Sequence, residues 1–518
     1  MPQRAAGSRS QPYGCDLAVL VHEFPKLSET FVLSDLLALE EAGVRLHVFS
    51  IRQPQLGVEQ DEVQRLKARV EYLPDIAARG IGPLLRASRA MLLLRNPQSY
   101  LSGLAEIYAS PDFSRARLKQ AVLLARRLDR LGSPPLYIHF AHRPATIGRF
   151  ACLMLGTPFA ISAHAVDVWT TPVKELRTKI RDAELVLSCY REAQEYLARL
   201  SGGRTPVELA YHGVALPAAL ERREASPPML LSIGRLIEKK GFDTLLRAAG
   251  LLAERGFDFR LVIAGEGPLW ATLQRQANEL GLGERVRFLG PVNQRELEPY
   301  FATAAGFVLA CQTTADGNRD GLPNTLLEAM AHGVPAVSTT LDSIREAVPD
   351  DGYGLLVPPR DHVALAEALT SLLQDPQLRK RLGSAGHARV TEFFDRRVFR
   401  TRVSGLLAGV GMISSPEAGA IAGSRASHAH RADLDVPHGT GQRLLYLSAD
   451  PGVPVFGGKG ASIHLQSLVA GIRELGVEVT VASPRLEPGP NSLPEGIRLA
   501  PIPAVRPREC ASPEEVLE

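Results

Sequence analysis

Two carboxylates, Asp320 and Glu328, stand eight positions apart with a predicted helix start between them. Pro323 suits the first helical position because its missing N–H needs no partner there, and Gly333 marks the expected end of the helix. Glu328 is therefore expected on the helix and Asp320 in the loop before it. A simpler interpretation is an ordinary amphipathic helix with solvated acids.

The start of this helix is a candidate phosphate site. Free backbone N–H groups and the positive end of the helix dipole favour an anion at Leu322, Asn324 and Thr325. A carboxylate accepts hydrogen bonds from two neighbouring hydroxyls, so Glu328 could hold a ribose while Asp320 faces a sugar beyond the phosphates. The two acids would then flank a bound diphosphate.

Two cations five positions apart, Arg235 and Lys240, follow a predicted strand. A planar guanidinium and a mobile ammonium both stabilise the negative charge that grows on a departing diphosphate. The alternative is a pair of solvated surface cations.

Glycine-rich turns follow the next two strands. Gly265 and Gly267 follow the strand that ends at Ala264, and Val292 lies in the turn after the strand that follows. Glycine permits a tight turn and a close approach of the backbone to a nucleotide, although each turn alone is a weak signal.

Polar residues also follow the ends of predicted strands in the first half of the chain. His164 and Asp167 follow one strand, and His142 and Arg143 follow the strand before it. A buried structural histidine is the alternative for His164. No metal is predicted, because His139 and His142 have no third ligand of known geometry.

Composition indicates an ordinary globular protein. The 518 residues are 45% hydrophobic and 22% charged, with a formal net charge of +3, so nothing demands a nucleic-acid partner. No apolar run approaches the length of a membrane span, and residues 1–11 lack the apolar core of a signal peptide. The five cysteines are widely separated and form no metal or redox motif. We expect a cytoplasmic protein, with the inner face of the plasma membrane as the alternative location.

Apolar runs rich in β-formers alternate with helical patterns over the first four hundred residues or so, as in parallel sheets covered by helices. The predicted fold class is α/β, with two doubly wound, Rossmann-like domains that face a cleft. The expected strands lie at 17–21, 44–50, 70–73, 136–140, 159–163, 185–188, 207–211, 230–233, 260–264, 286–289, 307–309, 336–338 and 355–357.

The predicted boundaries give six segments. They are a flexible N-terminus (1–15), a first domain (16–215), a linker (216–228), a second domain (229–409), a disordered linker (410–442) and a partial third unit (443–518). The partial unit repeats the pattern of residues 16–50, namely strand, loop, helix, Gly-Val and strand, with a Gly-rich loop at 457–460. We expect it to end before a full sheet is complete.

The segment 81–104 mixes leucines with arginines. This pattern suits a helix on an anionic membrane surface, near a lipid-linked acceptor. A core-facing helix with snorkelling arginines is the alternative.

The ordered set of motifs in 234–241, 264–268, 288–292 and 320–333 resembles the donor domain of retaining GT-B glycosyltransferases of the group 1, or GT4, family. The resemblance covers about residues 16–407. The segment from Glu23 to Phe31 replaces the Gly-Gly loop common in the family and resembles its colanic-acid, exopolysaccharide branch, although Ser28 could simply cap the following helix.

The resemblance implies a role for each site residue. Glu328 would bind the ribose, Asp320 the donor sugar, Arg235 and Lys240 the diphosphate, and His164 the sugar beside the reacting carbon. The family has Glu where Asp320 stands, which leaves the sugar open. The donor would be a UDP-sugar or GDP-sugar, with no cofactor or metal required. We assign the following residues to the acceptor side: Lys26, Glu29, His142, Arg143 and Asp167.

Three functions follow from this pattern. The first is transfer of a sugar to a glycan or lipid-linked acceptor in exopolysaccharide synthesis. The second is a nucleotide-sugar 2-epimerase of the same fold, and the third is a non-catalytic nucleotide-sugar-binding module, suggested by the shorter acid at position 320.

Overall fold

The computed structural model describes residues 14–54, 61–73, 97–223 and 225–414, together with three strands at 443–447, 478–483 and 498–501. The chain divides into two compact units, Met1–Ala420 and Ile421–Glu518. Several predictions lie outside the described residues, namely those for 1–13, for 81–96, for most of the linker 410–442 and for the loop 457–460.

The first sheet has seven parallel strands in the order β3-β2-β1-β4-β5-β6-β7. Near-continuous burial on both faces explains why its strands are apolar runs rather than alternating patterns. The strands are β1 (Leu17–Glu23), β2 (Leu46–Arg52), β3 (Arg69–Tyr72), β4 (Leu136–His139), β5 (Phe159–Ala163), β6 (Leu185–Ser188) and β7 (Val207–Leu209).

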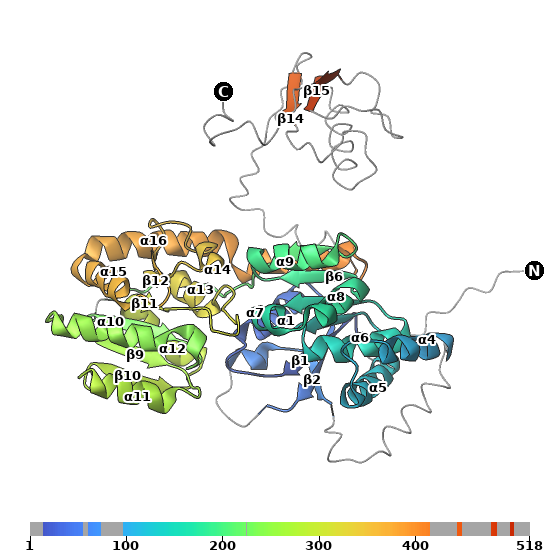
Figure 1. The fold of residues 1–518 in the computed structure, drawn as a ribbon, viewed down its shortest axis with the longest axis horizontal. Helices are drawn as coiled ribbons and strands as arrows, with labels where there is room; N and C mark the ends of the chain where they lie inside the picture. Colours follow the sequence, from blue (N-terminus) through green and yellow to red (C-terminus); the bar gives the residue numbers. More distant parts are fainter. Residues whose placement is uncertain are drawn as a thin grey trace, which may run out of the picture. The chain divides into compact units, whose positions relative to one another are not determined.

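Helices join these strands, and α4 and α5 both pack against α6 (Figure 1). They are α1 (Thr30–Glu41), η1 (Asp61–Arg65), α4 (Pro97–Tyr108), α5 (Arg115–Arg130), α6 (Arg143–Leu155), α7 (Ala165–Thr170), α8 (Val173–Asp182) and α9 (Arg191–Ser201). In the part of the chain that the structure describes, no helix is both long and apolar enough to cross a bilayer.

The second sheet has six parallel strands in the order β10-β9-β8-β11-β12-β13. They are β8 (Met229–Ile233), β9 (Arg260–Ala264), β10 (Val286–Gly290), β11 (Ala304–Val308), β12 (Ala336–Thr339) and β13 (Leu355–Val357). The helices are η2 (Glu238–Lys240), α10 (Phe242–Glu254), α11 (Trp270–Glu279), α12 (Gln294–Thr303), α13 (Asn324–Ala331), α14 (Asp342–Arg345), α15 (His362–Gln374) and α16 (Pro376–Phe393). The two sheets confirm the predicted α/β class with two doubly wound halves.

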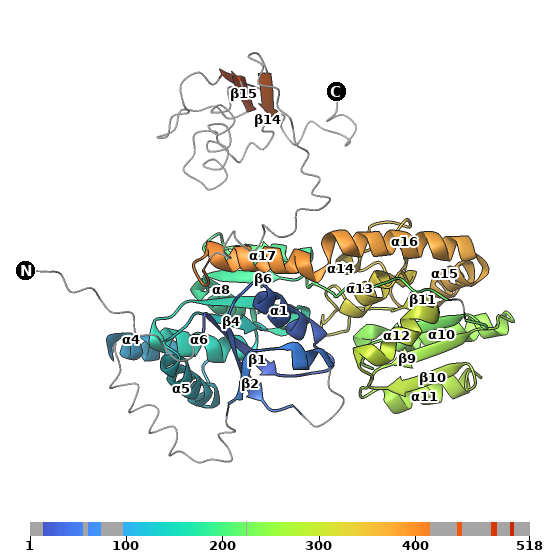
Figure 2. The ribbon, with the colours of Figure 1, turned by 180° about the vertical axis from the view of Figure 1, so that it is seen from behind.

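The last helix of this unit, α17 (Arg396–Gly409), packs against α1 of the first half rather than on the second sheet (Figure 2). Phe399 and Val403 share an apolar cluster with Leu33 of α1. The chain crosses between the halves twice, and the crossings are joined, because Val214 N–H donates to Phe394 O at 2.9 Å and Arg396 N–H donates to Val214 O at 3.0 Å. We therefore propose that the first domain includes α17, beyond the boundaries expected from the sequence.

The segment predicted as a linker after residue 215 is attached to the second half. The Arg222 guanidinium donates to the carbonyl oxygens of Phe301 and Ala304, and Arg223 N–H donates to Ala302 O at 2.9 Å. This segment therefore lies against the end of α12.

The second unit contains a parallel three-stranded sheet in the order β14-β15-β16. Its strands are β14 (Arg443–Leu447), β15 (Glu478–Ser483) and β16 (Arg498–Pro501). The first three strands of the chain have the same sequential order, β1 next to β2 and β2 next to β3.

Candidate active site

Asp320 lies between two lysine ammonium groups. Lys239 Nζ lies 3.0 Å from one carboxylate oxygen and Lys240 Nζ 2.9 Å from the other. The short 3₁₀ turn η2, which follows β8, directs both neighbouring lysines toward the loop before α13. Burial alone would raise the pKa of Asp320, but Lys240 and then Lys239 outweigh it and hold that pKa far below its usual range. Asp320 is therefore ionised and paired in the unliganded protein.

This pairing changes the picture drawn from the sequence in two ways. Lys240 does not project freely toward a phosphate, because Asp320 already neutralises it. Lys239, which the sequence analysis did not select, is as close to Asp320 as Lys240 is. A departing diphosphate would meet two buried ammonium groups here rather than one, and each can exchange its carboxylate for a phosphate oxygen.

The helix after Asp320 begins one residue later than predicted. Pro323 is the N-cap of α13 in extended conformation, so Asn324 is the first helical residue. Thr325 Oγ1 donates to Ile233 O at 3.1 Å, which ties the helix start to the end of β8. The helix ends at Ala331, and Gly333 takes the left-handed conformation (φ 67°) that closes it.

Glu328 lies on the buried face of α13 and faces the first half of the chain. Thr30 Oγ1, at the start of α1, donates to Glu328 Oε1 over 3.4 Å, a long and weak bond. Burial raises the pKa of Glu328 to about 7, against the hydrogen bonds from Thr30 and Gln294. Among the described residues, no ion pair neutralises this carboxyl, so a ligand with hydroxyl donors would favour its ionised form.

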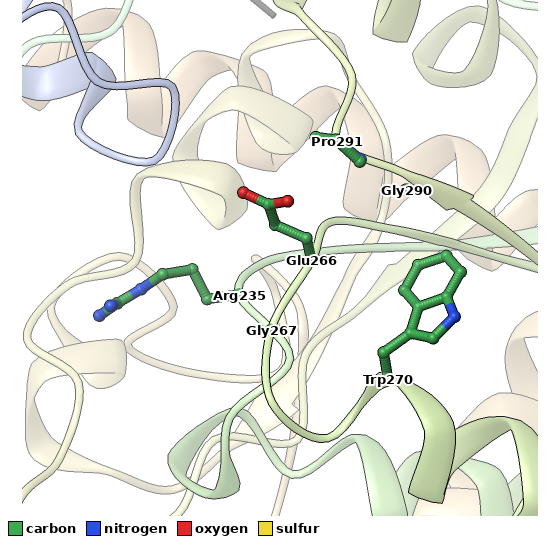
Figure 3. A pocket seen from close by; sticks show the side chains of 6 residues that line it. All are labelled: Arg235, Glu266, Gly267, Trp270, Gly290 and Pro291. Atoms are coloured by element: carbon green, nitrogen blue, oxygen red, sulfur yellow. The ribbon is translucent and has the colours of Figure 1, made fainter. Parts of the chain in front are cut away.

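An open hollow of about 590 Å³ lies beside the predicted glycine turns. In Figure 3 the side chains of Arg235 and Trp270 extend to opposite sides of Gly267. Glu266 and Trp270 had no signal in the sequence beyond their nearness to the glycines. The residues that line the hollow are Arg235, Glu266, Gly267, Trp270, Gly290 and Pro291, so Val292 is not among them.

The glycines of this turn are required by the protein itself. A Cβ at Gly265 would lie 2.0 Å from Gly234 O, and one at Gly267 would lie 2.5 Å from Leu236 O. Gly265 also has φ 135°, which side-chain-bearing residues rarely adopt. The turns after β8 and β9 are therefore in direct backbone contact, whether or not a nucleotide binds.

We expect Gly265→Ala to destabilise the fold by about 1–3 kcal/mol, because a methyl group at this φ must push two loops apart. Thermal unfolding of the free protein measures this loss. Gly256→Ala is the matched control for positive φ alone, since nothing lies within 4 Å of its Cβ position. Equal melting temperatures for the two variants would show that loop contact contributes nothing.

The predicted acceptor-side residues Lys26 and Glu29 pair with each other. Lys26 Nζ lies 2.5 Å from Glu29 Oε1. Burial raises the pKa of Glu29, while Lys26 and the more distant Arg235 lower it, so Glu29 faces a cation of the second half. Glu29 itself is the N-cap residue of α1. The predicted cap by Ser28 is therefore wrong.

Asp167 is fully buried, and its carboxylate is hydrogen-bonded to backbone N–H groups. Its carboxylate accepts hydrogen bonds from the N–H of Ala141 and, at 3.0 Å, from the N–H of His164. Burial raises the pKa of Asp167 to about 7, and these bonds oppose the shift. Both oxygens are thus engaged by the ends of β4 and β5, and we propose a positioning role in place of the predicted acceptor contact.

His142 and Arg143 lie at the start of α6, at the edge where β4 ends. The Arg143 guanidinium donates to Gln120 Oε1 at 2.9 Å, and the His142 carbonyl accepts from the buried Lys179 ammonium at 3.2 Å. Burial lowers the pKa of His142 to about 4, so its ring is neutral. Their acceptor role stays a prediction.

His164 is the N-cap residue of α7 and is buried among aromatic rings. Its ring lies 4.7 Å from Phe31 and 4.4 Å from Phe140, measured between centroids. Burial, followed by the neighbouring histidines, holds its pKa well below 6.5, so the ring is neutral. Both ring nitrogens have protein partners, and its contact with a donor stays a prediction.

A further contact joins the two halves beside Asp320. The Arg319 guanidinium pairs with Glu192 of α9 and lies 3.6 Å above the Trp169 ring. A second small hollow of about 190 Å³ adjoins it. The loop that carries Asp320 is therefore held by side chains of the first half.

Comparisons with known proteins identify the family. A model described as "Glycosyl transferases group 1" matches residues 220–389. The chain is 32% identical over 264 residues to a GDP-mannose-dependent alpha-(1-6)-phosphatidylinositol monomannoside mannosyltransferase of Mycolicibacterium smegmatis, over 48% of this chain and 69% of the relative. The chain belongs to the group 1 glycosyltransferases.

Other relatives extend the likeness to both halves. This glycosyltransferase is 26% identical over 405 residues to the putative colanic acid biosynthesis glycosyltransferase WcaL of Escherichia coli, over 74% of this chain and 97% of the relative. Its fold is that of sucrose-phosphate synthase from Thermosynechococcus elongatus (TM-score 0.58, 19% identity, 76% and 98% of the two chains). It also matches Anabaena HepE in complex with UDP and glucose (TM-score 0.57, 16% identity, 76% and 99%).

These findings confirm the predicted GT-B fold and the prediction of an enzyme. Group 1 glycosyltransferases use nucleotide-sugar donors, so the donor class follows for this glycosyltransferase. The 2-epimerase hypothesis is not favoured, because the matching family and the named relatives are transferases.

Proposed function

We propose that this glycosyltransferase retains the donor's anomeric configuration and works without a metal ion. The observation that carries the metal-independent part is the placement of Lys239 and Lys240 around Asp320, beside the start of α13, while retention is what the resemblance to retaining enzymes implies. The glycosidic C–O bond to the phosphate breaks and the nucleoside diphosphate leaves with the bonding electrons. The acceptor hydroxyl attacks the same face of the sugar and passes its proton to the departing phosphate oxygen.

The protein's own cations replace a metal in this step. Lys239, Lys240 and Arg235 place positive charge where the diphosphate charge grows, and the free N–H groups of Asn324 and Thr325 add to it. When the donor binds, the two lysines leave Asp320 and contact phosphate oxygens instead. The carboxylate of Asp320 is then free to accept hydrogen bonds from the sugar hydroxyls. The Glu328 carboxylate accepts hydrogen bonds from the ribose hydroxyls.

The donor nucleotide is UDP or GDP. Relatives of both kinds exist, since the M. smegmatis mannosyltransferase is named as GDP-mannose-dependent and HepE is named in complex with UDP. The hollow at Glu266 and Trp270, next to Arg235, is where we place the nucleoside. Gly267 lines this hollow, and Gly265 and Val292 stay predicted nucleotide contacts beside it.

The acceptor is a glycan or a lipid-linked glycan of exopolysaccharide synthesis. Two relatives named for colanic acid and amylovoran biosynthesis support this class. Leu101 and Tyr108 on α4 are both more than half exposed, which favours contact of this helix with a membrane surface at the cytoplasmic side. Lys26, Glu29, His142 and Arg143 would line the acceptor side.

The second unit resembles the beginning of another such enzyme. Its strands β14, β15 and β16 are parallel and in sequential order, as β1, β2 and β3 are. Leu444 pairs with Val479 where Leu17 pairs with Leu46 in the first unit. We infer that residues 443–518 correspond to the opening part of a second group 1 transferase domain.

Thermal shift against UDP-sugars and GDP-sugars tests the donor. A ligand that binds the folded state alone raises the melting temperature, and the productive donor is then used in a transfer assay with and without EDTA. We expect one donor to bind, transfer unaffected by EDTA, and a product with the donor's anomeric configuration by NMR. Inversion, loss of activity on chelation, or binding without transfer or hydrolysis would each contradict the proposal.

A further inference from the structure

His164 stands at one end of a row of three buried polar side chains. The carboxylate of Asp35, on α1, lies 3.4 Å from His212 Nδ1, and His212 Nε2 lies 3.2 Å from His164 Nδ1. All three side chains are less than a tenth exposed. They come from α1, from the segment after β7 and from the end of β5, so the fold brings them together from distant parts of the sequence.

The proton positions in this row of side chains follow from the chemistry of Asp35 at one end and His164 at the other. An ionised carboxylate accepts hydrogen bonds and donates none, so His212 Nδ1 carries a proton. A buried carboxylate also needs a positive partner, and His212 supplies one when its second nitrogen is protonated as well. His212 Nε2–H then donates to His164 Nδ1, and the single proton of a neutral His164 resides on Nε2.

We propose that the Asp35–His212 pair is a positioning device that holds His164 in the Nε2–H tautomer for contact with the donor. This inference rests on the proposed role of His164 in the transferase site. The partner of Nε2 inside the protein is Ser162 Oγ at 3.5 Å, the weaker of the two contacts of this ring. A donor oxygen can therefore replace Ser162 while Nδ1 stays fixed.

The surroundings of His212 support its charged form. Burial alone disfavours an imidazolium, but Asp35 and then Cys189 outweigh it and raise the pKa of His212 to about 10. His164 and Cys189 also lie beside His212, and its ring stacks on Phe31 at 4.7 Å between centroids. His139, farther along the stack of rings, has a pKa lowered to about 4 by burial.

NMR of the full chain with ¹⁵N-labelled histidine tests the proton assignment directly. In the wild type near neutral pH, both nitrogens of His212 carry protons, and His164 carries its proton on Nε2. His212→Gln and His164→Gln assign the signals. A neutral His212, or a His164 protonated on Nδ1, overturns the proposal without reference to activity.

Asp35→Asn provides the functional half of the test. The variant leaves His212 neutral, and kcat falls by about tenfold or more while the donor KM changes little, because the donor hydrogen bond is no longer fixed in direction. Ser34→Ala is the matched control on the same helix: it removes a buried hydroxyl bonded to Gly213 O, and the His164 tautomer stays as in the wild type.

The test separates this inference from the proposed function. If transfer occurs and His164→Gln is fully active, the role of His164 fails while the donor site stands. Because His164, Cys189 and His212 place ligand atoms within 4.8 Å of one another, the metal content is measured too. One bound metal ion per chain, lost in His212→Gln, overturns the proposal, since the metal would then take the place of the proton between the rings.

Discussion

Lys240→Ala is expected to lower kcat for sugar transfer by about 10²–10³-fold with the fold intact. The ammonium group supplies charge where the diphosphate leaves, and loss of one such preorganised donor has an effect of about this size. The fold survives because Asp320 keeps Lys239 at 3.0 Å, so the buried carboxylate is not left without a positive partner. Steady-state kinetics with the productive donor measure the loss, and circular dichroism checks the fold.

Arg247→Ala is the matched control for Lys240→Ala. Arg247 lies on α10, just beyond η2, and its pair with Asp243 is solvent-exposed, so its removal is expected to leave both stability and transfer nearly unchanged. Full activity in Lys240→Ala would reject the diphosphate role. A melted Lys240→Ala protein would instead assign Lys240 to stability, and Lys240→Arg would then separate charge from fold.

Glu328→Gln is expected to weaken donor binding by about 10–100-fold, because an amide nitrogen replaces an acceptor oxygen and hydrogen bonds to a charged group are worth about 1.5–3 kcal/mol. The change is nearly isosteric and removes a buried acid, so stability should not fall. Isothermal titration calorimetry with the donor measures the affinity.

The same carboxyl predicts how binding depends on pH. Its pKa of about 7 in the folded protein lies above the usual value of 4.5, so the free folded state holds the proton more tightly than the unfolded chain. This stabilises the free protein at low pH, and the stabilisation is lost as pH rises through about 7. A donor that needs the carboxylate should bind more tightly over the same rise, and Glu328→Gln should remove both trends.

A wild-type affinity that is constant between about pH 6 and 8, with a Gln variant of equal affinity, would show that Glu328 does not meet the ribose. The titration of the donor's own phosphates is controlled by the Gln variant, because both proteins meet the same ligand.

Most strands were predictable because they are short, continuous apolar runs buried on both faces. The runs 159–163, 185–188 and 260–264 coincide with β5, β6 and β9 to the residue. The parallel direction of the strands was predictable too, since helices alternate with strands along the chain. What the pattern could not show was which half α17 would join, because an amphipathic helix fits any apolar surface, and the cluster around Leu33 and Phe399 is formed by tertiary contacts.

The sequence alone singled out part of the candidate site. Asp320, Glu328 and Lys240 stood out by spacing, but Lys239 did not, because adjacent residues of an α-helix diverge and the tight turn η2 brings both lysines to one acid. Asp35 and His212 are far apart in sequence and carry no motif. The backbone contact at Gly265 was equally hidden, since the sequence shows a glycine but not the carbonyl oxygen opposite it.

We infer a hinge from the double crossing at Val214 and Arg396. Two hydrogen-bonded chain segments that run side by side allow rotation about one axis and resist rotation about others. The second sheet would therefore rotate about the crossing as about a hinge. Thr30–Glu328 and Glu192–Arg319 lie away from that line and would separate first. Opening about this pivot would break the Thr30–Glu328 bond and the Glu192–Arg319 pair while the pairing at Val214 stays closed, so donor release would involve a few side chains rather than refolding.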